Sequence, residues 1–375
     1  MDWYLPGTKA GGPVRSVFSL VSLLKNEFDF YIITTNTDLG SSEEYATIVA
    51  NTFFIKDEIN YYYFKLKSLT NVNVVNIITQ INPDLIYLNS FWSFNFSIKI
   101  IRLKNRHQIS APILLAPRGM LSKGALSLKA FKKKSYLLLA KRLGWYKNIY
   151  FHATNRDEEK DIKKWFPNAV VKIASNVNAG KTITNTALKK STSLNLFFLS
   201  RISKVKNLHF ALEVLKNIPK DIKINYDIYG NIEDHSYWQK CLEIIKLLPK
   251  NISVTYKKEL AFNEVQTIIG NYHALFLPTL NENFGHSIVE SLLTGCLAII
   301  SDQTPWHDIE KNNAGFAISL NNKQRFVDVI IELASLNQDA FLQKSLAANN
   351  YISSKVETEK NSHLYKTLFN GFIKN

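Results

Sequence analysis

The order of apolar segments constrains the fold of this chain more than any other feature. Short runs rich in Ile, Val, Phe and Tyr alternate with longer segments of helical period, a pattern typical of βα units around parallel sheets. The expected strands are residues 28–34, 85–88, 112–116 and 149–152 in the first half, and 195–200, 224–229, 252–256, 274–277 and 297–301 in the second. The sequence therefore predicts an α/β protein with two doubly wound sheets.

The length of 375 residues also indicates two domains, because single hydrophobic cores rarely grow this large. Residues 176–193 are polar and contain no aromatic side chain, as expected of a connection between domains. We expect an amino-terminal domain over residues 1–176, a carboxyl-terminal domain over 177–345, and a helical segment over 346–375 that packs back on the first domain.

The cysteine content and the apolar runs bear on where the chain works. Cys241 and Cys296 are the only cysteines, so a disulfide framework has no support and a reducing compartment, the cytoplasm, is expected. The amino terminus shows no pattern of a secretory signal. The longest apolar run, residues 292–300, is too short to span a bilayer.

The formal net charge of +15 is unevenly distributed. No acidic residue occurs between Asp84 and Asp157, whereas lysine and arginine recur from Lys99 to Lys147. Such a field attracts phospholipid headgroups, a pyrophosphate-linked lipid or nucleic acid, unless it is merely a solvated basic face. Because no recognised nucleic-acid-binding module is present, we expect no nucleic acid partner.

A helix expected over residues 125–144 lies within this basic window. Its apolar positions Leu128, Phe131, Leu138 and Leu139 are interleaved with lysines, so the helix can lie on an anionic membrane surface. The alternative is that these apolar side chains face the core of the first domain while the lysines are solvated.

The strongest local pattern is Glu282-Asn-Phe-Gly-His-Ser-Ile-Val-Glu290, which follows an expected strand and opens a helix that Gly295 can end. Free backbone N–H groups at Phe284, Gly285 and His286 favour an anion or a hydroxyl-rich ligand. Glu282 before the helix and Glu290 within it can each accept hydroxyl hydrogen bonds, although both can equally be surface charges.

Two further segments carry candidate phosphate ligands. Arg201 and Lys206 follow the strand over 195–200 and can converge on one diphosphate, although basic loops are common. Gly11 and Gly12 precede a helical pattern and allow close approach of a phosphate or sugar, although a plain turn would look the same. The latter segment lacks the Gly-x-Gly-x-x-Gly pattern, which argues against NAD.

Taken in order, these segments resemble the retaining glycosyltransferases of family 4. The family's Glu-x7-Glu motif is met by Glu282 and Glu290, its Arg-x4-Lys clamp by Arg201 and Lys206, and its Gly-Gly loop by Gly11 and Gly12. Further similarity lies in residues 116–121, 151–155, 227–230 and 304–308. The first and the last of these segments are typical of a branch found in bacterial surface-polysaccharide clusters.

The resemblance implies a GT-B fold, in which two Rossmann-like domains face each other across a cleft. It further implies a donor of the UDP-sugar or GDP-sugar type and a glycan or lipid-linked acceptor on the first domain. Glu282, Arg201, Lys206 and Arg118 would be catalytic, and Glu290 would hold the ribose. Gly11, Gly12 and the residues Asn283, Phe284, Gly285 and His286 would join the donor site. No Asp-x-Asp occurs, so no metal and no other cofactor is expected.

The sequence departs from the family at three places. Pro117 and Arg118 stand where many relatives have a histidine, so we expect Arg118 to face the sugar or the acceptor. Ser175-Asn176-Val177 replaces the usual Pro-Asn-Gly turn, and the first strand of the amino-terminal domain is expected to be missing. His152 follows a strand and can act either as a base or as a hydrogen-bonded structural residue.

Three other functions stay open at this point. A nucleotide-sugar epimerase shares the architecture but needs acid and base residues around the sugar that are not identifiable. A nucleic-acid-binding protein is suggested by charge alone. A catalytically silent protein of this fold would result if the altered Pro117-Arg118 segment and a missing strand abolished turnover. We expect a glycosyltransferase that works in the cytoplasm, peripherally on the inner face of the membrane.

Overall fold

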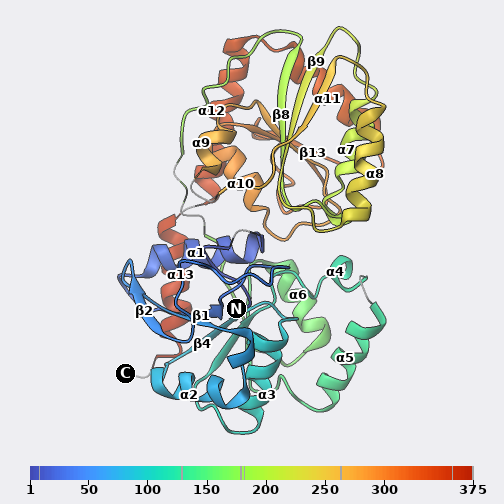
Figure 1. Cartoon of the computed structure of the whole chain (residues 1–375). Helices are drawn as coiled ribbons and strands as arrows, with labels where there is room; N and C mark the ends of the chain where they lie inside the picture. The colour runs from blue at the N-terminus through green and yellow to red at the C-terminus, as the bar shows by residue number, and fades with distance from the viewer. Residues whose placement is uncertain are drawn as a thin grey trace. The chain divides into compact units, whose positions relative to one another are not determined.

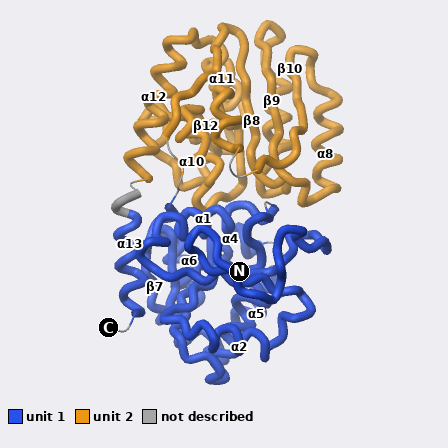
Figure 2. Tube along the Cα trace, turned by 60° about the vertical axis from the view of Figure 1, so that its left-hand side comes forward, with its two compact units in different colours: residues 1–179, 358–375 blue, residues 180–357 orange. Residues whose placement is uncertain are grey.

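The computed structural model divides into two compact units, which we call unit 1 (residues 1–179 and 358–375) and unit 2 (residues 180–357) (Figure 2). The structure describes residues 1–7, 9–127, 130–177, 180, 182–261, 264–356 and 358–373, apart from the side chains of 358–360. No helix in these ranges is long and apolar enough to cross a membrane.

Unit 2 contains one parallel sheet of six strands in the order β10-β9-β8-β11-β12-β13. Its strands are β8 (Ser193–Leu199), β9 (Lys223–Tyr229), β10 (Ile252–Tyr256), β11 (Ala274–Leu277), β12 (Leu297–Ser301) and β13 (Gly315–Ile318). Its helices are the 3₁₀ turn η3 (Lys204–Lys206), α7 (Leu208–Leu215), α8 (His235–Lys246), α9 (Val265–Ile269), α10 (His286–Leu293), α11 (Lys323–Ser335) and α12 (Gln338–Lys355).

Strands β11 and β12 of this sheet are apolar up to the final Ser301 because both of their faces are covered. Every residue of β11 and β12 is buried. Figure 1 shows α9, α10 and α12 on one side of the sheet and α7, α8 and α11 on the other. Such a strand leaves no solvent-facing side for polar residues, which explains the continuous Ile, Leu and Phe runs in the sequence.

Unit 1 contains a three-stranded sheet in the order β1-β3-β2 and a four-stranded parallel sheet in the order β4-β5-β6-β7. Its strands are β1 (Tyr31–Thr35), β2 (Phe53–Lys56), β3 (Ile59–Phe64), β4 (Ile86–Asn89), β5 (Ile113–Ala116), β6 (Tyr150–Ala153) and β7 (Val171–Ile173). Its helices are α1 (Gly12–Leu24), η1 (Leu66–Ser68), α2 (Asn71–Ile81), the π-helical turn η2 (Phe94–Ile98), α3 (Lys99–Asn105), α4 (Lys123–Ser127), α5 (Ala130–Arg142), α6 (Arg156–Trp165) and α13 (Thr358–Asn370).

The two helices at the end of the chain belong to different units. Tyr351 and Ile352 of α12 are buried in the core of unit 2. Leu368 and Phe369 of α13 instead join a buried cluster with Leu20 of α1 and other residues of unit 1. The segment expected over 346–375 is thus shared, with the change of unit at residue 357.

The polar connection expected over 176–193 is held against unit 2 for much of its length. The Ile183 N–H donates to the Leu293 carbonyl at 2.9 Å, and the Lys189 ammonium donates to the Ala334 carbonyl at 2.8 Å. Lys189 is only 6% exposed, and burial lowers its pKa to about 8. The polar composition of residues 176–193 therefore reflects their hydrogen bonds to unit 2 as well as their role as a connection between the two units.

The helix expected over residues 125–144 is present as α4 and α5, and Leu128 between them lies outside the described residues. The alternative in which its apolar residues face the core is wrong for the three that are described. Phe131 is 86% exposed, and Leu138 and Leu139 are exposed as well. The side chains of α5 that are buried are Leu137 and Ala140.

Gly230, directly after β9, fixes how closely two loops of unit 2 approach each other. A Cβ at this position would lie 1.9 Å from the Ser200 carbonyl oxygen, and its φ of 141° disfavours other residues. We expect Gly230→Ala to lower the free energy of unfolding by about 2–3 kcal/mol, measured by urea titration. Gly40→Ala, which also has positive φ but open space, should cost about 1 kcal/mol. Equal losses would contradict the clash.

Candidate active site

The strand order of unit 2 reverses between β8 and β11. The chain proceeds outward from β8 to β9 and β10, then returns to the other side of β8 for β11, β12 and β13. In open parallel sheets, ligands bind outside the carboxyl ends of the strands at such a reversal. Lys206 lies in η3 after β8, and Glu282 lies in the loop after β11. Two predicted site residues therefore lie at the carboxyl ends of the two strands between which the order reverses.

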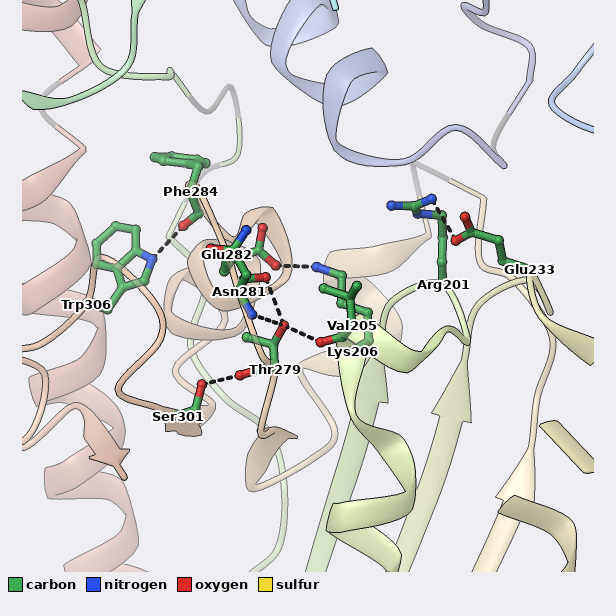
Figure 3. Close-up of polar contacts among 10 residues, drawn as sticks. All are labelled: Arg201, Val205, Lys206, Glu233, Thr279, Asn281, Glu282, Phe284, Ser301 and Trp306. Atoms are coloured by element: carbon green, nitrogen blue, oxygen red, sulfur yellow. Dashed lines mark hydrogen bonds and ion pairs between the residues drawn. The ribbon is translucent and has the colours of Figure 1, made fainter. Parts of the chain in front are cut away.

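Lys206 and Glu282 form an ion pair between Lys206 Nζ and Glu282 Oε2 (Figure 3). The two side chains are 12% and 17% exposed, so the pair is largely shielded from water. Shielding strengthens the attraction but also makes either charge costly to leave alone. The site therefore holds one cation and one carboxylate that neutralise each other.

Backbone hydrogen bonds fix the loop that carries Glu282. The Leu280 N–H donates to the Val205 carbonyl at 2.8 Å, which ties this loop to η3. The Thr279 hydroxyl donates to the same carbonyl at 3.1 Å, and the Glu282 N–H donates to the Gln303 carbonyl at 3.0 Å. The loop after β11 is thus bound to the loops after both neighbouring strands, which places Glu282 beside Lys206 (Figure 3).

Helix α10 is preceded by a glycine at which an added Cβ would crowd its neighbours. Gly285 has φ of 81°, and a Cβ there would lie 2.7 Å from Ile288 Cδ1 and 3.2 Å from Glu282 Cγ. The indole of Trp306 donates to the Phe284 carbonyl at 2.6 Å and holds the preceding residue. Helix α10 thus starts directly after the loop that carries Glu282, at the helix start that the sequence predicted.

Glu290 lies one turn inside α10 and is 7% exposed. Glu282 is also mostly covered, so neither carboxylate is the solvated surface charge that the sequence had left open. Asn283 and His286 lie on the same loop and at the first position of α10. The ring of Phe284 contacts those of His286 and Trp306, with centroids 4.8 Å and 5.9 Å apart.

Arg201 has a different carboxylate partner from Lys206. Its Nη1 lies 2.7 Å from Glu233 Oε2, and both side chains are well exposed, at 38% and 43%. Exposed pairs of this kind contribute little to stability, so Arg201 can exchange Glu233 for another anion at small cost. Glu233 lies in the loop after β9, and no motif in the sequence singles it out.

The glycine pair of unit 1 stands at the start of α1, as expected. Gly11 is the N-cap residue with φ of 66° and ψ of −128°, and an added Cβ would meet no atom within 4 Å. The open space at Gly11 means that its glycine is required by backbone conformation and not by local crowding. Pro13 in the first turn pre-sets the helical φ.

Arg118 lies among polar side chains of unit 1. Its guanidinium donates to Asn89 Oδ1 at 2.6 and 3.0 Å, to the Tyr87 hydroxyl at 3.1 Å, and to Asn176 Oδ1. Burial opposes the charge, but the neighbouring Tyr87, Tyr365 and Glu158 raise the pKa of Arg118 above its ordinary value. A contact between Arg118 and a sugar or an acceptor stays a prediction.

His152 is fully buried beside Arg118 and is held by two hydrogen bonds. Its Nε2 lies 2.8 Å from the Ala174 carbonyl, which can only accept, so Nε2 carries the proton. Nδ1 then accepts from the Tyr87 hydroxyl at 2.7 Å. Burial and the nearby Arg118 charge lower the pKa of His152 to about 3. Both nitrogens are used inside the protein, so the geometry favours the structural role over a base.

No group of three His, Cys, Asp or Glu side chains in the described residues lies close enough to hold a metal ion. The site residues that sequence reasoning missed are Glu233, Thr279, Ser301 and Trp306. Ser301 donates to the Thr279 carbonyl at 2.5 Å and so links the ends of β12 and β11. Thr279 and Ser301 could have been found from their positions in the sequence, because Thr279 follows β11 and Ser301 ends β12.

Residues 181–351 match the glycosyl transferases group 1 family. The matched part covers most of unit 2, including Lys206, Glu282 and α10. Among proteins of curated function, none matches the sequence.

Several solved structures share the fold. HepE of Anabaena, in complex with UDP and glucose, is 13% identical with a TM-score of 0.69, covering 98% of each chain. WaaG, a glycosyltransferase involved in lipopolysaccharide biosynthesis, is 12% identical with a TM-score of 0.66, covering 100% of this chain and 99% of its own. A variant of TarM from S. aureus, with fondaparinux, α-GlcNAc-glycerol and UDP, is 17% identical with a TM-score of 0.62. That match covers 80% of this chain, which spans 59% of the TarM chain. The predicted GT-B fold is confirmed by these likenesses.

The buried neutral state of His152 predicts a pH effect on stability. Because its pKa is about 3 in the folded protein and near 6.5 when unfolded, the unfolded chain binds the extra proton between these values. Its contribution to stability is therefore present above pH 6.5 and falls as the pH is lowered, by up to about 1.4 kcal/mol per pH unit. The free energy of unfolding, measured by urea titration at several pH values between 7 and 4, should change less with pH in His152→Gln than in the unaltered protein. An NMR titration of His152 with a midpoint near 6.5 would contradict the assignment.

Proposed function

We propose that the chain is a retaining glycosyltransferase that transfers a hexosyl group from a nucleoside diphosphate sugar to a glycan or lipid-linked acceptor in bacterial surface-polysaccharide biosynthesis. The observation that carries the proposal is the shielded Lys206–Glu282 pair between the ends of β8 and β11, next to the start of α10. The group 1 family match over residues 181–351 supports the transferase class. Likeness to proteins solved with UDP supports a nucleotide donor.

The diphosphate of the donor would bind to Lys206 and to the N–H groups at the start of α10. An ammonium and a helix amino terminus both favour an anion at the same place. Arg201 would turn from the exposed Glu233 and add a planar, two-pronged contact. No metal and no other cofactor is required in this proposal, because fixed cations stabilise the charge of the departing diphosphate.

The sugar and ribose would bind to the two carboxylates. When the diphosphate takes Lys206, the charge of Glu282 loses its partner and becomes available to accept hydrogen bonds from donor sugar hydroxyls. Glu290, buried one turn later, would hold the ribose, and Asn283 and His286 would complete the donor site. The pair therefore explains how an empty site avoids leaving two shielded charges unpaired.

The reaction would proceed on one face of the sugar. The bond between the anomeric carbon and the diphosphate oxygen breaks, and the acceptor oxygen forms its bond on the same face. The departing phosphate oxygen accepts the proton of the acceptor hydroxyl. The protein contributes orientation and charge stabilisation, which are worth a few kcal/mol for each well-placed donor. In unit 1, Gly11, Gly12 and Arg118 are proposed to contact the substrates.

Turnover tests the diphosphate contacts. With UDP- and GDP-sugars as donors in excess EDTA, we expect Arg201→Ala and Lys206→Ala each to reduce nucleoside diphosphate release by roughly two orders of magnitude. Lys246→Ala is the matched control, because Lys246 also pairs with a glutamate, Glu243 at 2.9 Å, but lies on α8. Full activity of a folded Arg201 or Lys206 variant would remove that residue from the mechanism, and loss in EDTA that manganese restores would contradict metal independence.

Helix α5 carries a surface that could bring the enzyme to a lipid-linked acceptor in a membrane. Phe131 and Leu138, seven positions apart on α5, are 86% and 61% exposed, and the exposed Leu139 and Leu143 lie four apart. Exposed lysines at 132, 134 and 141 surround them, within a window that has no acidic residue. Apolar side chains among cations fit an anionic leaflet, and we propose that α5 binds the inner face of the cytoplasmic membrane.

Co-sedimentation with vesicles containing anionic phosphatidylglycerol tests this surface. We expect binding at low salt that weakens at high salt, because each surface cation contributes about 1 kcal/mol. The pairs Lys132→Glu with Lys134→Glu, and Phe131→Ser with Leu138→Ser, should each weaken binding at least tenfold. Lys220→Glu with Lys246→Glu makes the same charge change on unit 2 and should have little effect. Equal weakening by this control, or no binding of the unaltered chain, would contradict the proposal.

A further inference from the structure

The basic residues between β8 and α7 each lie beside a carboxylate from another loop. The pairs are Arg201 with Glu233, Lys204 with Asp234, and Lys206 with Glu282. The nitrogen and oxygen atoms are 2.7 Å apart in the first pair and 3.8 Å apart in the second. Figure 3 shows the first and the third pair as separate contacts. The segment between β8 and α7 contains no acidic residue, so its positive charges are balanced by carboxylates from the loops after β9 and β11.

The backbone, and not the ion pair, places Glu233 opposite Arg201. Ile202 forms a parallel bridge with Ile232 beyond the ends of β8 and β9. The Ile202 N–H donates to the Asn231 carbonyl at 2.9 Å, and the Glu233 N–H donates to the Ile202 carbonyl at 3.2 Å. Pairing between the two chain segments thus continues past the strands. A change of the Glu233 side chain should therefore leave the course of both loops as it is.

Glu233 and its neighbour Asp234 have different hydrogen-bond partners. The Asp234 carboxylate accepts from the Tyr237 N–H at 2.9 Å and from the Ser236 hydroxyl at 2.7 Å, so it caps α8. Within the described part of the chain, the Glu233 carboxylate is bonded to Arg201 alone. Both members of this pair are well exposed, and exposed ion pairs add little to stability. The main effect of Glu233 is therefore on what Arg201 can bind.

A carboxylate on Arg201 competes with any other anion for the same guanidinium. A diphosphate that binds Arg201 must either displace Glu233 or lie close to its negative charge, and both weaken the binding. Because the pair is exposed, dissolved salt screens this competition. The exchange also runs in reverse, since Glu233 can return to Arg201 when the diphosphate leaves.

We propose that Glu233 is a built-in competitor of the donor diphosphate. It holds Arg201 when no nucleotide is bound, lowers the affinity for nucleoside diphosphates and speeds the release of the nucleoside diphosphate product. Glu233 acts through Arg201 and is a positioning residue, not a catalytic one. This inference rests on the proposed function, because it requires the donor diphosphate to bind Arg201.

Binding of UDP and GDP, measured by isothermal titration calorimetry, tests the competition. For the nucleotide that binds more tightly, we expect Glu233→Gln to lower the Kd about fivefold at low salt, mostly through slower dissociation in stopped-flow measurements. The gain should shrink at high salt. Glu310→Gln is the matched control and should leave the Kd unchanged. Glu310 pairs with Arg325 at 2.9 Å and with similar exposure, but it lies between β12 and the edge strand β13.

A double-mutant cycle shows whether Glu233 acts through Arg201. In an Arg201→Ala background, Glu233→Gln should change the Kd by less than about twofold, because the guanidinium for which the anions compete is gone. An equal gain in both backgrounds would mean direct repulsion of the ligand and would overturn the proposal. An unchanged Kd in Glu233→Gln alone, or the same gain in Glu310→Gln, would also overturn it.

These outcomes leave the proposed function standing, because they all require that a nucleoside diphosphate binds. The proposed function fails instead if neither UDP nor GDP binds the unaltered chain at any salt concentration. That result would overturn the role of Glu233 together with the proposed function.

Discussion

The parallel sheet of unit 2, buried on both faces, is the constraint on which the candidate site depends. Strands β11 and β12 have no exposed side, and the one polar side chain on them, Ser301, lies where β12 ends. The reversal of strand order at β8 and β11 separates the connections that follow these two ends. Lys206 and Glu282 occupy this position, and the hydrogen bonds from the 279–282 loop to Val205 and Gln303 hold them together.

The balance of charge at this position explains how the candidate site can be stable when it is empty. A shielded carboxylate without a partner would be costly, and so would a shielded ammonium. Pairing the two removes both costs in the empty protein. A ligand that carries both an anion and hydroxyl groups can replace both ion-pair partners, the anion binding to Lys206 and the hydroxyl groups to Glu282. A nucleoside diphosphate sugar carries both kinds of group.

The sequence predicted all nine strands that it named, because buried parallel strands are continuous apolar runs bounded by turns. It missed β2, β3, β7 and β13 for local reasons. The β2–β3 turn uses Asp57 and Glu58, both with positive φ, in place of the Asn-Gly or Asp-Gly that marks such a turn. Strand β7 has three residues with a central lysine, and β13 begins at Gly315, packed against Ala298.

The candidate site was predictable where it depends on position after a strand or before a helix. Glu282, Gly285 and the start of α10 are in this class. The pairing of residues from different loops was not predictable, because nothing in the local sequence joins Glu233 to Arg201 or Trp306 to Phe284. Exposure of Phe131 on α5 also required the structure, since the apolar pattern fitted a core-facing helix equally well.

A crystal structure of the chain with UDP or GDP would show whether the Lys206–Glu282 pair opens to bind a diphosphate. We expect the diphosphate to lie within hydrogen-bond distance of Lys206 Nζ and of the first N–H groups of α10, with Glu282 released from Lys206. A nucleotide bound away from the ends of β8 and β11, with the Lys206–Glu282 pair intact, would contradict it.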